Sequence, residues 1–297
     1  MKDLKGVIAL IPTPLTDAGK VDEDSLKKLI DYDLENGCSG VGVLAAIGEG
    51  YLFSSQDVQK MVKTAASHLA GKSNLIVGCP AMGTREAVEK CKQAENLGAD
   101  AILAFNPKYR LINPYSSIEL YNHYVAITSA VKVPILPYSQ VDDVIPYEVV
   151  KQLVEEKRIS YMKYGAHDCN LMRKMVESLG DKLFIFVGAD TFTLRYLLMG
   201  GKGILTATAA VFPKENSILL STVQKGDIDA AREYYAENII PWNDCGFYQR
   251  WQAAHKFALM QMGIFRSTKC MPPLSLPIED FQEDEITYLL RSKGKII

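Results

Sequence analysis

The sequence predicts a (β/α)8 TIM barrel of the α/β class with a C-terminal helical extension. Short apolar runs alternate strictly with longer segments of helical period, which indicates repeated βαβ units around a parallel sheet. Eight such pairs can be counted along the chain. Together they occupy about 225 residues, a length typical of a closed barrel.

The strand candidates are rich in Val, Ile, Leu and Ala on both faces, as expected for parallel strands that are buried on both sides. In chain order they are Gly6–Pro12, Gly40–Ile47, Asn74–Ala81, Ala101–Phe105, Pro134–Tyr138, Ile159–Lys163, Phe184–Gly188 and Gly203–Thr208.

The helix candidates fall between these strands. They are Glu23–Glu35, Ser55–Leu69, Arg85–Leu97, Ser116–Ser129, Pro146–Glu156, Asn170–Ser178, Phe192–Met199 and Lys214–Gln224. Four helices are expected to end at a glycine able to take a positive φ, namely Gly37, Gly98, Gly180 and Gly226. Thr84, with acidic residues behind it, is the predicted N-cap of the third helix.

A doubly wound open sheet is the alternative fold, but the first βα turn lacks the G-x-G-x-x-G phosphate loop of a dinucleotide-binding domain. After Gly226 no further strand is indicated. The pattern there predicts helices over Ile228–Asn238, Asp244–Met262 and Asp284–Arg291. We therefore expect a barrel domain, residues 1–226, and a helical extension, residues 227–297, packed on the barrel.

Composition favours a small-molecule partner. The 297 residues are 48% hydrophobic and 23% charged with a net charge of -2, which gives no electrostatic footprint for nucleic acid or an anionic membrane. No run approaches the roughly 18 apolar residues of a membrane span, and the N-terminus is too brief and too charged for a signal peptide, so we expect a cytoplasmic protein. The six cysteines are scattered without a C-x-x-C pair, which favours free thiols over disulfides or a zinc site.

Lys163 stands in a strand-like run, just before Gly165, and therefore at the carboxyl end of the sixth strand, where TIM barrels carry their sites. An isolated lysine there commonly reaches solvent. However, Tyr138 and Tyr109 follow the ends of neighbouring strands. A lysine beside phenols suits Schiff-base chemistry, for which burial must lower its pKa from ~10.4 towards 7, a shift worth roughly 4 to 5 kcal/mol. The phenols would then move protons.

Several motifs occur in a characteristic order over almost the whole length. They are Gly6–Leu15, the Gly48-Glu49 turn followed by Leu52, Tyr138, Lys163 with Asp168, Gly188–Asp190, Gly200–Ile204 and Pro272–Leu274. In these motifs the chain resembles the dihydrodipicolinate synthase and N-acetylneuraminate lyase family of class I, lysine-dependent barrel enzymes.

The resemblance implies a set of residue roles. Lys163 would form an imine with the keto carbon of pyruvate or another 2-oxo acid, and Tyr138 would shuttle protons. Tyr109 looks like the family's second tyrosine, which supports the relay, often across a subunit boundary. Glu49 and Asp168 would be structural and hydrogen-bond loop amides. Substrate contacts would fall on Ala46, Ile47, Gly48, Asp143, Gly188 and Leu205. Enzymes of the family are usually homotetramers, dimers of dimers, without a metal or organic cofactor.

Two positions depart from the family pattern. Members that use pyruvate typically have two hydroxyl residues before the Gly-Glu turn to hold the carboxylate, where this chain has Ala46 and Ile47. Losing a hydrogen bond to a charged group costs about 1.5 to 3 kcal/mol, or roughly ten- to hundredfold in affinity. Asp143 stands where the lysine-pathway enzymes place an arginine, and an acid there would repel their substrate. His167 and Asp142 are further polar groups near the expected mouth.

These observations favour a lyase acting on a 2-oxo acid, with a substrate that is more apolar or less anionic at its carboxylate end. The lysine-pathway synthase activity of the family is an alternative, disfavoured by Ala46, Ile47 and Asp143. A second alternative is an inactive paralogue that serves as a binding or scaffold protein. A third is a phosphate-binding barrel that uses Gly201 and Gly203, although tight packing explains these glycines as well.

Overall fold

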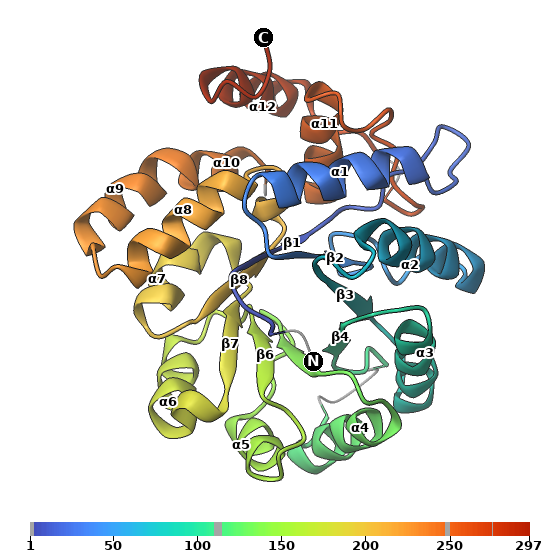
Figure 1. Ribbon diagram of the computed structural model, residues 1–297, viewed down its shortest axis with the longest axis vertical. Helices are drawn as coiled ribbons and strands as arrows, with labels where there is room; N and C mark the ends of the chain where they lie inside the picture. Colours follow the sequence, from blue (N-terminus) through green and yellow to red (C-terminus); the bar gives the residue numbers. More distant parts are fainter. Residues whose placement is uncertain (1–2, 110–114, 247–249, 275) are drawn as a thin grey trace.

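Eight parallel strands close into a barrel at the centre of the molecule, with β1 paired to both β2 and β8 (Figure 1). The computed structural model describes residues 3–109, 115–246, 250–274 and 276–297. The strands are β1 (Val7–Leu10), β2 (Gly40–Val43), β3 (Asn74–Cys79), β4 (Ala101–Phe105), β5 (Ile135–Ser139), β6 (Tyr161–Tyr164), β7 (Phe184–Val187) and β8 (Gly203–Thr206). The predicted fold class is confirmed.

A helix follows each strand on the outside of the barrel (Figure 1). These helices are α1 (Glu23–Glu35), α2 (Ser55–Leu69), α3 (Thr84–Asn96), α4 (Ser117–Ala130), α5 (Tyr147–Glu155), α6 (Cys169–Leu179), α7 (Thr193–Leu198) and α8 (Pro213–Gln224). The predicted bounds differ from these by at most one residue at either end. The four predicted helix-ending glycines all have positive φ, which confirms that expectation.

Two local predictions are wrong. Gly83, not Thr84, is the N-cap of α3, because the Thr84 hydroxyl instead hydrogen-bonds to Nδ1 of His123 on α4, at 2.9 Å. The predicted second strand is also too long. The chain leaves the sheet after Val43, because Leu44 takes a left-handed conformation with φ 59°. A left-handed residue cannot continue a strand, so a turn begins there.

Apolar side chains pack in two shells, one between the strands and the helices and one inside the barrel. Successive side chains along β6 alternate between these two shells. Met162 and Tyr164 belong to the outer shell, so Lys163 between them points into the barrel. The barrel interior below it is filled by large side chains such as Leu136, Phe186 and Leu205. This packing fills the middle of the barrel, and Lys163 lies at its carboxyl end, where TIM barrels bind their ligands.

After α8 the chain continues as α9 (Ile228–Asn238), α10 (Ile240–Gly246), α11 (Trp251–Gln261) and α12 (Asp280–Ser292), which confirms the helical extension. The single helix predicted over Asp244–Met262 is wrong, because α10 ends at Gly246 and Arg250, with φ 57°, precedes a new helix. Residues 247–249 of that prediction lie outside the described residues. The segment after α11 returns to α1, where Arg266 donates to Asp24 at 3.0 Å.

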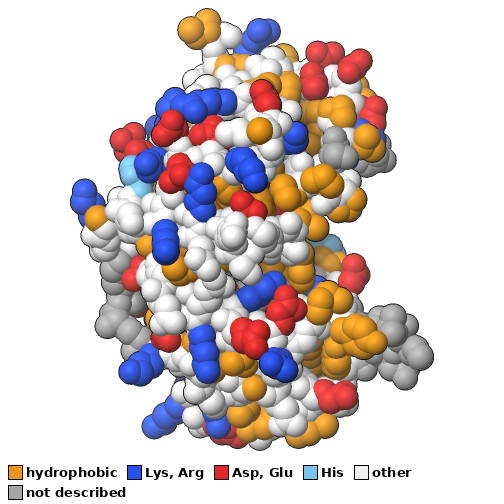
Figure 2. All heavy atoms as spheres, turned by 90° about the vertical axis from the view of Figure 1, so that its right-hand side faces the viewer, with side chains coloured by type: hydrophobic (Ala, Val, Ile, Leu, Met, Phe, Trp, Pro, Cys, Tyr) orange, Lys and Arg blue, Asp and Glu red, His pale blue; other side chains and the backbone are white. Residues whose placement is uncertain are grey.

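The surface agrees with the balanced composition. On the face drawn in Figure 2, basic and acidic side chains are interspersed, and apolar side chains gather toward the right-hand edge. Within the described ranges, no helix combines the length and the apolar character needed to cross a membrane.

Candidate active site

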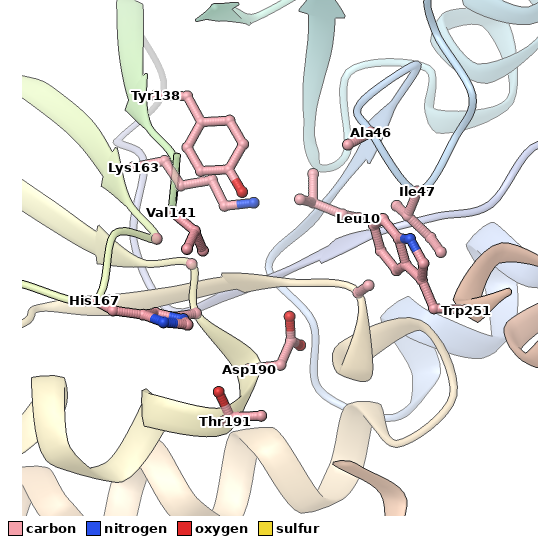
Figure 3. A pocket seen from close by; sticks show the side chains of 14 residues that line it. Leu10, Ala46, Ile47, Tyr138, Val141, Lys163, His167, Asp190, Thr191 and Trp251 are labelled. Atoms are coloured by element: carbon pink, nitrogen blue, oxygen red, sulfur yellow. The ribbon is translucent and has the colours of Figure 1, made fainter. Parts of the chain in front are cut away.

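A cavity of about 240 Å³ lies at the carboxyl end of the barrel (Figure 3). Its polar wall is made by Tyr138, Lys163, His167, Asp190 and Thr191. The apolar residues of the lining are Leu10, Ala46, Ile47 and Trp251, which lie side by side, Val141, which lies next to Lys163 (Figure 3), and Ala207. Trp251 is the first residue of α11, so the C-terminal helices supply part of the site.

Lys163 brings a buried amine into this cavity. Its side chain enters from β6, and only 4% of the residue is exposed. Nζ lies over the Tyr138 ring, 4.0 Å from the ring centroid. Burial lowers the pKa of the Lys163 amine to about 7, although the nearby Asp190 carboxylate acts in the opposite direction. A large share of the amine is therefore uncharged, and nucleophilic, at neutral pH.

Two glycines make room for these side chains. A Cβ at Gly188 would lie 2.1 Å from Cε of Lys163, and a Cβ at Gly165 would lie 3.0 Å from the Tyr138 ring. Gly188 also lines the cavity, as the sequence analysis expects of a residue near the substrate. The structure thus adds a steric reason for glycine at this position.

Tyr138 lies beside Lys163 because the two residues are direct partners in the register of β5 and β6. Its ring packs edge-on against Phe105, with centroids 5.5 Å apart. Burial, together with the charge of Asp190, raises the pKa of the Tyr138 phenol well above its usual value, and Gln140 acts in the opposite direction. The phenol is therefore protonated at neutral pH and can donate to a group held near Lys163.

Asp190 faces the same cavity, and no role is predicted for it from the sequence. It begins the short helix η2 (Asp190–Phe192), and its Oδ1 accepts hydrogen bonds from the Thr208 backbone at 2.9 Å and from the Thr208 hydroxyl at 2.5 Å. Burial raises the pKa of Asp190, while the Thr208 hydrogen bonds and Lys163 oppose the rise. The position of the Gly188–Asp190 motif could have predicted a site role for Asp190, because the motif follows the end of a strand at the mouth of the barrel.

The turn after β2 contributes Ala46 and Ile47 to the cavity wall. Gly48 lies behind them, since its Cβ would meet the backbone of Leu44 at 2.9 Å. Glu49 fixes the turn, as its carboxylate accepts the Met271 backbone N–H at 2.6 Å and lies 2.5 Å from Lys256 Nζ. Both charged side chains are fully buried.

Asp168 has a similar local role to that of Glu49. Its side chain caps α6 by accepting the backbone N–H of Leu171 at 3.0 Å. The expectation of a hydrogen bond to a loop amide agrees with the Glu49 contact to Met271, whereas Asp168 binds an amide in the first turn of α6.

Three of the expected site residues, Asp143, Leu205 and Tyr109, do not line the cavity. Asp143 is buried beside Lys108, with Oδ2 2.6 Å from Nζ. Leu205 lies in the apolar shell inside the barrel. Tyr109 is 59% exposed at the rim. His167 does line the cavity, and its ring packs on Phe192 with centroids 4.6 Å apart. In the part of the chain that the structure describes, no cluster of His, Cys, Asp or Glu could hold a metal ion.

An amine and a phenol at the mouth of a closed eight-stranded barrel define a TIM-barrel enzyme, in which the βα loops form the site. Residues 3–293 match the model of the dihydrodipicolinate synthetase family, and the chain belongs to this family. Its homologues are lyases of the aldolase type.

Similar proteins cover nearly the whole chain. The 4-hydroxy-tetrahydrodipicolinate synthase of Pseudomonas syringae is 29% identical over 265 residues, 88% of this chain and 89% of the relative. That of Thermodesulfovibrio yellowstonii is 29% identical over 296 residues, 98% and 99% of the two chains. A crystal structure of a dihydrodipicolinate synthase is 26% identical with a TM-score of 0.91, covering 99% of this chain and 100% of that one. A monomeric dihydrodipicolinate synthase variant, 24% identical over 99% of this chain and 98% of its own, shares the fold with a TM-score of 0.92.

Proposed function

We propose that this lyase joins Lys163 to the keto carbon of a 2-oxo acid as a Schiff base and then makes or breaks a bond at the adjacent carbon. The observation that carries the proposal is the buried Lys163 amine, with a pKa of about 7, against the Tyr138 ring. Membership of a family of aldolase-type lyases supports the reaction class.

The proposed steps use the two side chains in turn. The free amine of Lys163 attacks the keto carbon and gives a carbinolamine. Tyr138 donates its proton to the carbinolamine hydroxyl, which leaves as water while the nitrogen–carbon double bond forms. The resulting phenolate takes a proton from carbon 3. The electron pair of that C–H bond becomes the enamine double bond, and the iminium electrons return to nitrogen. The enamine then adds to an aldehyde, and the reverse sequence cleaves an aldol.

Backbone groups and apolar side chains support an unusual substrate preference. Glu49 and Gly50 use their N–H groups inside the turn, whereas the N–H groups of Ala46 and Ile47 have no hydrogen-bond partner among the described residues. We propose that these two N–H groups hold the keto acid's carboxylate without help from hydroxyls. Because Leu10 and Trp251 lie beside Ile47 in the cavity lining, the rest of the substrate is apolar rather than anionic (Figure 3).

The relatives' own reaction is the second candidate, and the site disfavours it. Among the described residues no arginine lines the cavity, and Asp143 forms an ion pair with Lys108. A charged aldehyde substrate would therefore lack a cation to hold its carboxylate. If the protein nevertheless condensed pyruvate with such an aldehyde at a rate matching the relatives, this preference would be refuted.

We also propose a homotetramer built as a dimer of dimers. Met82, Tyr109 and Ile118 are more than half exposed near the rim, where an apolar surface favours self-association. In such an assembly Tyr109 would support the proton relay of a neighbouring subunit. Light scattering coupled to size exclusion tests this proposal, and a monomer at micromolar concentration would contradict it.

Reductive trapping tests the Schiff base directly. The protein is treated with borohydride and either pyruvate, 2-oxobutanoate or an aromatic 2-oxo acid, and the intact mass and the modified peptide are determined. We expect one adduct, on Lys163. The Lys163→Arg variant should give none, whereas Lys202→Arg, a matched change at a surface lysine, should label like the wild type. A folded protein that no keto acid labels would instead support a binding or scaffold role.

A further inference from the structure

Trp251 is the largest side chain among the described residues of the cavity lining, and it takes no part in the proposed proton transfers. It is the first residue of α11, and its indole lies beside Leu10 and Ile47 (Figure 3). We call these three side chains the indole patch. Lys163 and Tyr138 enter the cavity from a different side (Figure 3). The indole patch is therefore a surface that a substrate can contact away from its reacting carbon.

The indole of Trp251 is held in place before any substrate arrives. Nδ1 of His255, one turn further along α11, donates to the Trp251 carbonyl at 2.8 Å. The His255 ring packs edge-on against the indole, with centroids 6.1 Å apart, and against Trp242 on its other contact, at 4.9 Å. His255 and Trp242 are both fully buried. An aromatic side chain that is already fixed loses little conformational entropy when a ligand packs on it.

The cavity is larger than the three-carbon head of a 2-oxo acid requires. An apolar cavity of about 150 Å³ is enough to hold a benzene ring. This cavity has a volume of about 240 Å³, so it can hold a ring of that size together with the keto acid head. The substrate can therefore fill the space between Lys163 and the indole patch.

The chemistry of the indole patch favours an aromatic ring over a saturated one. Its three side chains carry no charge, so burial alone would favour any apolar group equally. An indole adds a preference of its own, because aromatic rings attract each other in edge-to-face and offset-stacked arrangements beyond the effect of buried area. A flat aromatic ring therefore gains more from Trp251 than a cyclohexyl ring of similar size.

We propose that Trp251 is a specificity-determining residue that packs on an aromatic ring of the substrate, so that the enzyme acts on an aryl-substituted 2-oxo acid. This inference rests on the proposed Schiff-base function. Because Trp251 lies away from the reacting atoms, it should determine which keto acid is bound and leave the reaction of Lys163 with pyruvate unchanged.

The rate of reductive trapping at keto acid concentrations below saturation tests this selectivity. Phenylpyruvate and 2-oxo-4-phenylbutanoate are each compared with the analogue that carries a cyclohexyl ring, with cyanoborohydride as the reductant and intact mass as the readout. At one chain length or both, the wild type should form the aryl adduct about threefold to tenfold faster than the cyclohexyl adduct. Equal rates at both lengths would overturn the inference, because the indole patch would then be merely apolar.

Variants at Trp251 assign the preference to the indole. Trp251→Leu keeps an apolar side chain but removes the ring, so the aryl preference should disappear while pyruvate is trapped within about twofold of the wild-type rate. Trp251→Phe restores a ring and should recover most of the preference. Tyr288→Leu is the matched control, a ring removed from a 76% exposed position on α12, and it should behave like the wild type. If Trp251→Leu retained the aryl preference, the indole would not be its source and the inference would fail.

Failure of this inference and failure of the proposed function give different results. A wild type that is trapped by pyruvate on Lys163 but shows no aryl preference loses only the role of Trp251. A folded wild type that no keto acid labels loses the Schiff-base function itself. Because the comparison of aryl and cyclohexyl acids uses the wild type alone, it can refute the inference even where Trp251→Leu does not fold.

Discussion

Replacing Lys163 by methionine should stabilise the protein at neutral pH, and the gain should vanish in alkali. Burial lowers the pKa of this amine from its ordinary 10.5 to about 7 in the folded chain. Between these two pH values the unfolded chain binds a proton that the folded chain does not, so folding loses stability as the pH falls through the window. At 1.36 kcal/mol per pKa unit, the full shift corresponds to about 5 kcal/mol. A methionine side chain is similar in length to lysine and carries no charge, so the variant does not lose stability in this way.

The assay is urea unfolding of the wild type and Lys163→Met at several pH values from 7 to 10. Relative to the variant, the wild type should gain about 1.4 kcal/mol in free energy of unfolding per pH unit over the middle of this range. Other titrating groups are common to both proteins and cancel in the difference. Lys202→Met, a change at a surface lysine, should show no such slope. A difference between the wild type and Lys163→Met that did not depend on pH would refute a desolvated amine.

Three further predictions concern the same site. Gly188→Ala should abolish trapping of keto acids on Lys163 and lower the free energy of unfolding in urea by about 1 to 3 kcal/mol, because the added carbon would lie 2.1 Å from Cε of Lys163. Normal trapping would show that the lysine side chain can move out of the way. Tyr138→Phe should slow the loss of deuterium in water from pyruvate labelled at carbon 3 about 100-fold or more while KM changes little, and a variant with the wild-type rate would exclude the phenol from the proton transfer. Lys256→Met should cost about 3 to 5 kcal/mol because it leaves the buried Glu49 carboxylate without its cation, and the double variant with Glu49→Gln should lose less than the sum of the two single variants; losses that simply add would rule out coupling between the two residues.

The parts of the site that a local pattern can reveal were predicted from sequence. Lys163 and Tyr138 stand at the ends of recognisable strands, and alternation along a strand fixes which way each points. The bounds of the eight barrel helices were close to the observed ones because amphipathic period and terminal glycines mark them, whereas those of the C-terminal helices were predicted less well. The end of β2 was missed because a left-handed Leu44 carries no signal in residue type.

Contacts between distant parts of the chain could not be predicted. Asp190 gains its role from Thr208, which follows β8, and from Lys163, which lies in β6. Asp143 looked like an acid aimed at the substrate, and only the fold shows that Lys108 lies against it. A charge in a sequence does not identify its partner, because the partner is set by the packing of several elements.

The buried pair of Glu49 and Lys256 limits how this chain could be truncated or recombined with a related protein. The carboxylate belongs to the turn that carries Ala46 and Ile47, while the amine belongs to α11 and also donates to the Lys269 carbonyl at 2.7 Å. A barrel truncated after α8, or joined to the C-terminal helices of another protein, would leave the Glu49 carboxylate without Lys256. It would also lose Trp251 from the cavity lining. A recombined barrel should therefore take the turn after β2 and the C-terminal helices from the same parent protein.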